Sequence, residues 1–138
     1  TPSNSSAASD VYKRQRLQFA KKLHCAEHDA APRLGPRIVQ ADRDTPEACA
    51  AQIMELACEQ ISQVDVLILD ELGEAMRRGF VTREDVEALI AIKPATTELV
   101  LTGRGLLPLA DLADLVTEMR PIKHYFDEGL LARQGIEY

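Results

Sequence analysis

"VDVLILDELGEAM" (residues 64–76) decides the fold class of this chain. Five of its first six residues are apolar, and such a short apolar run is typical of a strand buried on both faces of a parallel sheet. Asp70 and Glu71 follow at the point where that strand would leave the sheet. The stretch therefore predicts a core strand that carries two adjacent carboxylates to one edge of the sheet.

Strand and helix patterns alternate on both sides of this stretch. The predicted strands lie at 16–22, 37–40, 64–69, 96–105 and 115–126, and the predicted helices at 44–62, 79–94 and 106–114. The segment 24–36 reads as a loop because it carries Pro32, Gly35 and Pro36, and 127–138 reads as a terminal helical turn with a tail. The alternation predicts an α/β fold in which a parallel sheet is flanked by helices.

The two longer predicted helices have recognisable first turns. Asp44 or Thr45 can cap the first helix, and Thr82 stands three residues before Asp85 at the start of the second, close to a capping box. Apolar residues then recur at helical spacing. The inner faces are predicted to hold Ile53, Leu56, Ala57, Gln60 and Ile61 in the first helix and Val86, Leu89 and Ile90 in the second.

The composition suits one domain. The chain has 138 residues, of which 46% are hydrophobic, and we expect a tail at 1–16 that is disordered or foreign and a domain at 17–138. The net charge of −6 argues against a nucleic-acid surface, and no apolar run reaches the roughly 20 residues that cross a bilayer. Three cysteines give no disulfide framework, so we expect reduced thiols and a cytoplasmic location.

The acidic pair has two readings. An apolar strand that ends in Asp-Glu is typical of enzymes that hold Mg²⁺ against a nucleotide phosphate, because magnesium takes oxygen ligands. In the other reading, Asp70 caps a helix that begins near Leu72, and Glu71 lies in its first turn. The pattern alone divides about evenly between the two readings.

The second motif is "TGRG", residues 102–105, at the end of another predicted strand. Gly103 and Gly105 would let the chain turn sharply beside a ligand, and Arg104 would direct a permanently charged group at phosphate oxygens. An ordinary surface turn with a solvated arginine is the alternative. In a parallel sheet both motifs reach the same edge, where ligands collect, and this favours the phosphate reading.

Two further segments carry chemistry-bearing residues. In "RPIKHYF" (120–126), Arg120, Lys123 and His124 could extend the same cationic rim, and a solvated loop is at least as good a reading. In "HCAEH" (24–28), His24 and His28 are four residues apart, but the segment is bounded by proline and no second ligand cluster has zinc-site spacing. We therefore predict no metal site at 24–28.

One expected companion motif does not occur in the sequence. A magnesium-binding Asp-Glu strand usually accompanies a phosphate loop with the pattern G-x-x-x-x-G-K-[ST], and none of the seven glycines precedes a lysine. In a doubly wound nucleotide fold this loop follows the first strand. We therefore expect the domain to be truncated at its first strand and helix.

Four stretches together closely resemble one family, the ATP:corrinoid adenosyltransferases, also called cob(I)yrinic acid a,c-diamide adenosyltransferases. They are 64–76, "LVLTGRG" (99–105), "DLADLVTEMRPIKHYFDEG" (111–129) and "ARQGIEY" (132–138), and "RLQFAKK" (16–22) resembles the second strand of that family. The resemblance runs in register from about Val64 to Tyr138. It implies a P-loop nucleotide-hydrolase-like (RecA-like) fold.

The resemblance also implies a reaction. These enzymes transfer the 5′-deoxyadenosyl group of ATP to a reduced Co(I) corrinoid, in cobalamin biosynthesis or salvage, and release triphosphate. By motif, Glu71 is expected to bind Mg²⁺ with Asp70 beside it, and Arg104, flanked by Gly103 and Gly105, to contact the triphosphate. Lys123 matches the lysine of a "KH" pair, and we count it among the ATP-binding residues. The family also implies a homodimer.

Two regions depart from the family pattern. The phosphate loop has no counterpart, and "PRLGPRIVQADRD" (32–44) has no aromatic residue where the family carries a "GFTW"-like segment facing the corrinoid. Each charge-assisted phosphate contact is worth ~1.5–3 kcal/mol, so we expect weak ATP binding by this chain alone. The alternative reading is a noncatalytic nucleotide- or partner-binding relative that has lost the phosphate loop.

Overall fold

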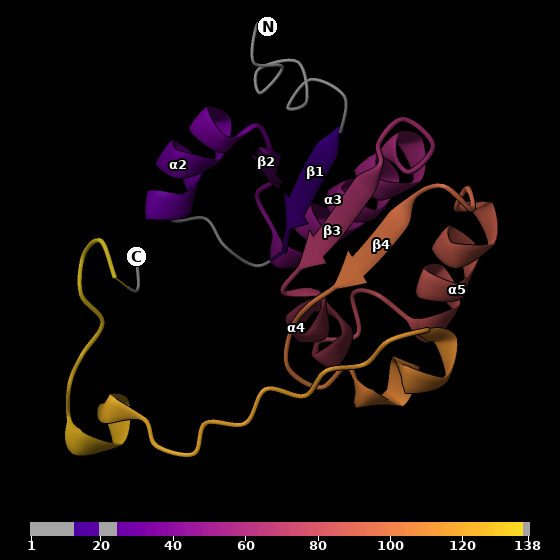
Figure 1. Ribbon diagram of the computed structural model, residues 1–138. Helices are drawn as coiled ribbons and strands as arrows, with labels where there is room; N and C mark the ends of the chain where they lie inside the picture. Colours follow the sequence, from indigo (N-terminus) through magenta and orange to yellow (C-terminus); the bar gives the residue numbers. More distant parts are fainter. Residues whose placement is uncertain (1–12, 20–24, 137–138) are drawn as a thin grey trace, which may run out of the picture.

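The computed structural model of the protein describes residues 13–19 and 25–136 (Figure 1). Four strands form one parallel sheet in the order β2-β1-β3-β4. The strands are β1 (Arg14–Gln18), β2 (Arg37–Gln40), β3 (Val66–Asp70) and β4 (Glu98–Leu101). The predicted parallel α/β fold is therefore confirmed, with all four carboxyl ends of the strands at one edge.

Both of the longer predicted helices form, and their caps explain where they begin. Thr45 accepts a hydrogen bond from the Ala48 N–H at 3.1 Å and starts α3 (Pro46–Gln60). Thr82 and Asp85 form a reciprocal capping box that starts α5 (Arg83–Ile92). None of the helices in the described residues is long and apolar enough to span a membrane.

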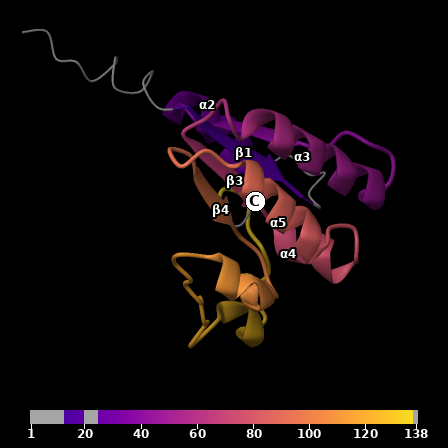
Figure 2. The same cartoon turned by 90° about the vertical axis from the view of Figure 1, so that its right-hand side faces the viewer.

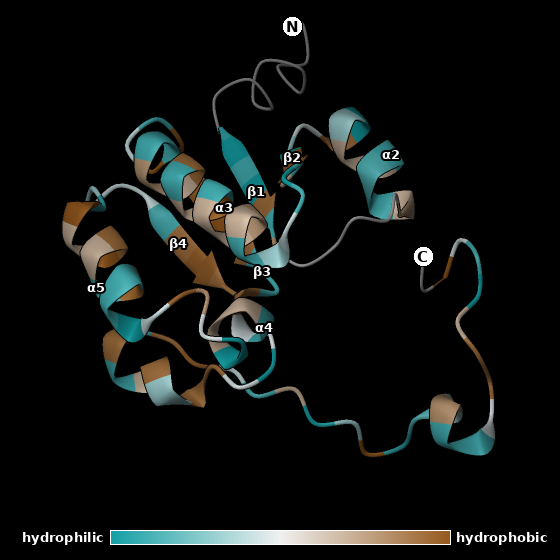
Figure 3. Cartoon of the chain, turned by 180° about the vertical axis from the view of Figure 1, so that it is seen from behind, coloured by the Kyte–Doolittle hydropathy of each residue, from teal (hydrophilic) through white to brown (hydrophobic). Residues whose placement is uncertain are grey.

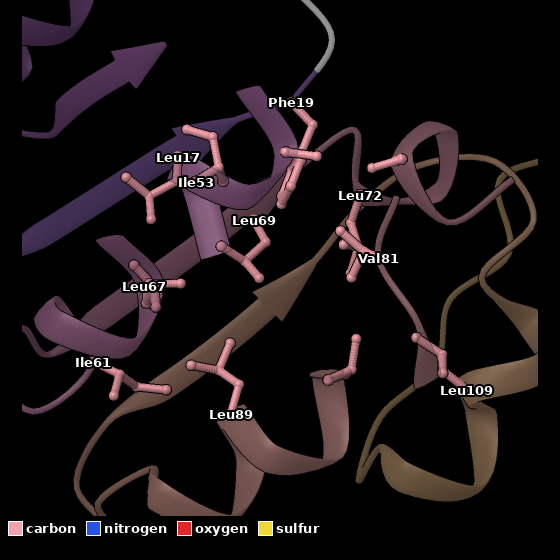
Figure 4. Close-up of a cluster of buried hydrophobic side chains, with 14 residues drawn as sticks. Leu17, Phe19, Ile53, Ile61, Leu67, Leu69, Leu72, Val81, Leu89 and Leu109 are labelled. Carbon is pink, nitrogen blue, oxygen red and sulfur yellow. The ribbon is translucent and has the colours of Figure 1, made fainter. Parts of the chain in front are cut away.

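The core lies between one face of the sheet and helices α3 and α5 (Figure 2). Figure 4 shows side chains from the strands and from both helices meeting there. The strands contribute alternate residues, because successive side chains point to opposite faces. The largest fully buried apolar side chains are Leu17, Phe19, Ile53, Ile61, Leu67, Leu69, Leu72, Val81, Val86 and Leu89.

The opposite face of the sheet is less well covered, which corrects the expectation that β3 is buried on both faces. Leu67 and Leu69 are fully buried, but Val66 and Ile68 on the other face are half-buried. Val100 on β4 pairs with Ile68 in register and is 41% exposed. Figure 3 shows that hydrophobic residues predominate along β4. Apolar content alone did not show that one face of β3 and β4 is only partly covered in the described part of the chain.

The predicted loop at 24–36 was wrong, because residues 26–34 form helix α2 (Ala26–Leu34) beside β2 (Figure 1). The helix begins at an unusual capping box in which the Cys25 N–H donates to Nδ1 of His28 at 2.9 Å. Acidic residues in the first turn, Glu27 and Asp29, favour the helix N-terminus electrostatically. These local interactions outweigh Pro32, which lies inside the helix.

The chain beyond β4 also differs from the prediction. The short helix at 106–114 forms as η1, a 3-10 helix over Leu107–Leu112, but no strand forms within 115–126. A strand needs a hydrogen-bonded neighbour, and Figure 1 shows this segment leaving the sheet after η1. A second 3-10 turn, η2 (Tyr125–Glu128), begins before the helical turn predicted within 127–138, and no helix forms at 129–136. The strand predicted at 16–22 forms as β1, which runs from Arg14 to Gln18. Residues 20–22 of the predicted range lie outside the described residues.

Candidate functional site at the carboxyl edge of the sheet

Three strands bring polar side chains to the same edge. Gln18 ends β1, Asp70 ends β3, and Thr102 directly follows β4. Gln18 and Asp70 are register partners, and the Thr102 N–H donates to the Leu69 carbonyl at 3.0 Å, so the ladder continues past the end of β4. The parallel topology therefore brings together residues that are 32 to 84 positions apart in the sequence.

The Asp70 carboxylate is fully engaged by its neighbours. The Thr102 hydroxyl donates to Oδ1 at 2.7 Å, while the Gln18 amide donates to Oδ2 at 3.1 Å and the Arg16 guanidinium forms an ion pair with the same oxygen. Burial by itself would raise the pKa of Asp70, but the hydrogen bonds from Arg16, Thr102 and Gln18, with the charge of Arg16, hold that pKa below its ordinary value. Asp70 is therefore an ionised residue that ties β1, β3 and β4 together.

Glu71 has the opposite environment. Its backbone is left-handed (φ 61°, ψ 27°), and it is the one non-glycine residue with positive φ among those described. Its N–H donates to the Thr102 hydroxyl at 3.2 Å, whereas its exposed carboxylate makes no hydrogen bond or ion pair within the described part of the chain. Strained backbone of this kind collects at functional sites. The strain turns the chain from β3 directly into α4 and leaves the carboxylate in solvent.

The alternative in which Asp70 caps a helix was wrong. Helix α4 (Leu72–Arg77) does begin where expected, but the capping position is Glu71, whose side chain makes no capping hydrogen bond. Asp70 remains the last residue of β3. The two adjacent acids thus have different surroundings: one is bound to the sheet and the other is exposed.

The turn 102–105 packs against the start of α4 at backbone contact. A Cβ atom placed on Gly73 would lie 1.9 Å from the Arg104 carbonyl oxygen, and one placed on Gly103 would lie 2.6 Å from the Gly73 nitrogen and 3.4 Å from the Glu71 carbonyl carbon. Gly103 and Gly105 both have positive φ, which fits the sharp turn foreseen from the motif. Glycine at 73 and 103 is what allows the two loops to touch.

The other predicted site residues divide into two groups. Arg104 lies in the turn itself and is exposed, and its guanidinium makes no ion pair among the described residues. Lys123 lies on the segment that leaves the sheet, where its Nζ is 3.6 Å from a Glu128 carboxylate oxygen. His124 accepts a hydrogen bond from the Phe126 N–H at 3.1 Å. The structure therefore brings the turn to the acidic pair and does not bring Lys123 there.

Sequence reasoning missed four contributors to this edge: Arg16, Gln18, Gly73 and Thr102. Thr102 was part of the quoted motif, but its hydroxyl was given no role. Gln18 is 1% exposed, and it also accepts from the Gln40 amide at 3.0 Å. Glutamine is uncommon at buried positions, so its presence within a predicted core strand was the signal that the sequence offered. Gly73 gave no signal before the position of the turn was known.

An apolar pocket of about 210 Å³ lies beside this edge and includes Gln18 in its wall. Its other residues come from the ends of β1 and β2, the start of α3 and helix α4: Phe19, Ala41, Pro46, Cys49, Ala50, Glu74, Ala75, Arg78 and Phe80. Hydrogen bonds from Arg77 and Arg78 lower the pKa of Glu74 to about 2, so this acidic wall stays ionised and paired. The pocket offers room for an apolar group next to the charged edge.

The donor set allows a test of the expected magnesium site. Glu71 fits, because its carboxylate is exposed and not engaged by any described residue, and oxygen is the donor magnesium prefers. Asp70 fits a direct contact poorly, because both its oxygens accept hydrogen bonds and a guanidinium lies against one of them. The structure thus favours Glu71 as ligand and Asp70 as its support.

A parallel sheet packed by helices, with acidic and glycine-rich turns at its carboxyl edge, defines a P-loop-like α/β domain. The family profile described as "ATP:corrinoid adenosyltransferase BtuR/CobO/CobP" matches residues 6–138. The chain belongs to this family.

Curated relatives agree with this assignment. The chain is 37% identical over 100 residues to a corrinoid adenosyltransferase of Pseudomonas aeruginosa, a match that covers 70% of this chain and 49% of that protein. It is 41% identical over 101 residues to one from Sinorhizobium, covering 70% and 47%. It is 38% identical over 76 residues to the corrinoid adenosyltransferase CobA of Salmonella typhimurium, covering 54% and 39%. The chain spans about half the length of the curated relatives it matches, or less.

Proposed function

We propose that this chain carries the magnesium- and triphosphate-binding edge of an enzyme that transfers the 5′-deoxyadenosyl group of ATP to a reduced corrinoid. The observation that carries the proposal is the contact between the Glu71–Gly73 backbone and the Gly103–Arg104 turn. It brings together the backbones of two residues with exposed side chains, Glu71 and Arg104, in a chain of this family. The apolar pocket beside the edge offers space for part of a larger substrate.

Glu71 is the metal-binding residue in this proposal. Bound Mg²⁺ supplies positive charge at the triphosphate oxygens. Glu71 suits this role because the left-handed backbone directs its carboxylate away from the sheet, while the Thr102 hydroxyl holds its N–H. Asp70 is a positioning residue, since its carboxylate holds Thr102, Gln18 and Arg16 in place.

Arg104 is the triphosphate-binding residue. The leaving triphosphate gains negative charge as the bond to the ribose 5′-carbon breaks, so a fixed cation beside it stabilises the transition state more than the ground state. Arg104 has no competing carboxylate partner among the described residues, which leaves its guanidinium free for phosphate oxygens. Gly103 and Gly105 set the turn that presents it.

Polyphosphate binding tests these roles directly. Isothermal titration with inorganic triphosphate, with and without Mg²⁺, is expected to show that Glu71→Gln loses the enhancement by Mg²⁺, while Arg104→Ala binds about 10- to 100-fold more weakly in both conditions. Glu98→Gln and Arg37→Ala are matched controls, because both residues are exposed and each is the first residue of its strand, at the opposite edge of the sheet. Binding by the Glu71 and Arg104 variants that equals the controls would exclude the assigned roles.

A noncatalytic nucleotide- or partner-binding relative is the second candidate. It is favoured by one observation: the sequence contains no G-x-x-x-x-G-K-[ST] motif. Incubation with Mg-ATP and a chemically reduced corrinoid separates the two candidates, because formation of a cobalt–carbon bond changes the corrinoid spectrum. Adenosyl transfer by this chain would exclude the second candidate.

A further inference from the structure

A second group of metal-ligating side chains lies at the start of α2. One ligand atom from each of Cys25, Glu27 and His28 lies within 4.8 Å of the others. Cys25 is 5% exposed, and the other two are half-buried, so the group has a solvent-facing side. Ligand atoms around a tetrahedral zinc ion are roughly 3–4 Å apart, so a small contraction would close the group around a cation.

Local backbone geometry explains why these three residues meet. Cys25 is the extended residue before the helix (φ −119°, ψ 164°), and Glu27 and His28 lie in the first turn. The His28 ring folds back over that turn, with Nδ1 3.1 Å from the Cys25 carbonyl oxygen. The spacing Cys-x-Glu-His therefore gathers sulfur, oxygen and nitrogen donors on one side of the helix start. Sequence reasoning had paired His28 with His24 instead, and His24 lies outside the described residues.

His28 now caps α2, because its Nδ1 accepts from the Cys25 N–H at 2.9 Å and its Nε2–H donates to Oε1 of Gln18 at 3.1 Å. Metal binding at Nε2 requires the other tautomer, in which Nδ1–H donates to the Cys25 carbonyl oxygen 3.1 Å away, and such a backbone contact commonly orients a ligating histidine. Oε1 of Gln18 also accepts from the Gln40 amide at 3.0 Å, so it keeps a donor when the imidazole turns to a cation.

The charges around the group partly balance. The Arg16 guanidinium lies 3.7 Å from Glu27, which opposes a bound cation, but the same guanidinium forms an ion pair with Asp70. A cysteine ligand binds as a thiolate and so adds a negative charge when the metal displaces its proton. Sulfur and imidazole donors select transition-metal cations over magnesium, which separates this group from the Glu71 carboxylate.

We propose that Cys25, Glu27 and His28 bind one divalent transition-metal cation of the zinc class. Three protein ligands leave the fourth tetrahedral position to water or to an exogenous ligand. The proposal does not depend on the proposed adenosyl transfer, because its ligands and its test involve neither ATP nor a corrinoid.

Cobalt(II) is the probe, because a cysteine ligand gives an intense thiolate-to-cobalt charge-transfer band. The 138-residue chain, stripped with a chelator, is expected to bind one equivalent of Co²⁺ with this band, and Zn²⁺ should displace it. Cys25→Ser is expected to abolish the band. Glu27→Gln, which leaves the thiol intact, should weaken binding at least about tenfold.

Two matched variants serve as controls. Cys58→Ser removes an exposed thiol on α3, and His124→Gln removes a histidine on the C-terminal segment, and both should bind like the wild type. Far-UV circular dichroism confirms that each variant is folded, and the Glu27→Gln result stands even if Cys25→Ser does not fold. The proposal is overturned if the wild type shows no charge-transfer band, if the band persists in Cys25→Ser, or if Glu27→Gln binds as tightly as the wild type.

Discussion

Replacing Gly73 with alanine sets two physical effects against each other. Gly73 is the second residue of α4 and has an ordinary helical position, where alanine is normally favoured by about 0.5–1 kcal/mol. The added methyl group would lie 1.9 Å from the Arg104 carbonyl oxygen, 2.8 Å from its carbon and 2.9 Å from its nitrogen. All three are backbone atoms, so no side-chain rotation can relieve the overlap.

The overlap should decide the sign of the effect. Overpacking a well-packed site costs typically about 1–3 kcal/mol, and a backbone contact this short belongs at or above the upper end of that range. After the helix preference is subtracted, we expect Gly73→Ala to lower the free energy of unfolding by about 2 kcal/mol or more. For a domain of this size that corresponds to a fall in Tm of roughly 5–10 °C.

Gly105→Ala is the matched control, because it lies in the same turn and separates backbone strain from overlap. Gly105 has φ +80°, but nothing lies within 4 Å of a Cβ placed there, so its replacement should cost only about 1 kcal/mol. Urea unfolding followed by circular dichroism measures both variants. A Gly73→Ala protein as stable as the wild type, or no less stable than Gly105→Ala, would refute the close approach of the two loops.

Three other changes test the strand ends and the core. Thr102→Val removes the donor to Asp70 and the acceptor for the Glu71 N–H, and should cost about 1–3 kcal/mol in urea unfolding, whereas the exposed Thr117→Val should not. The folded pKa of Asp70 lies below its ordinary value of 3.8, so its contribution to stability is complete above that value and is lost as the pH falls through the folded pKa. Asp70→Asn should therefore make stability depend less steeply on pH below 3.8. Ile53→Ala, at a fully buried position, should cost about 2–5 kcal/mol, and an unchanged midpoint would contradict the packing of α3 on the sheet.

The central part of the fold could be predicted because local and tertiary preferences agree there. The apolar run of β3 and the capped helices α3 and α5 each have a sequence signal that the tertiary structure reinforces. The interior face of α3 follows the helical period, with Ile53 and Ala57 fully buried. Such agreement between levels is what makes a segment predictable.

The predictions for residues 24–36 and 115–126 were wrong because the interactions that decide these two segments have no general sequence signal. Helix α2 begins at Cys25, whose N–H donates to the His28 ring. Pro32, Gly35 and Pro36 had favoured a loop for this segment. The segment 115–126 has apolar residues suitable for a strand, and Met119 and Ile122 are 91% and 96% exposed. Composition cannot tell whether a neighbouring strand is present to pair with such a segment.

At the site, the motifs predicted which residues approach one another but not what each one does. Asp70 and Glu71 are adjacent in sequence and chemically alike, and the strand pattern treats them as a pair. The structure separates them, because the last strand residue stays in register between β1 and β4, where it meets Gln18 and Thr102. The next residue must leave the sheet in a left-handed conformation, and its carboxylate is therefore directed to solvent. A strand that ends in two acids thus provides one carboxylate to hold the strand ends together and one to meet a ligand, and the order of the two follows from the geometry of the strand end.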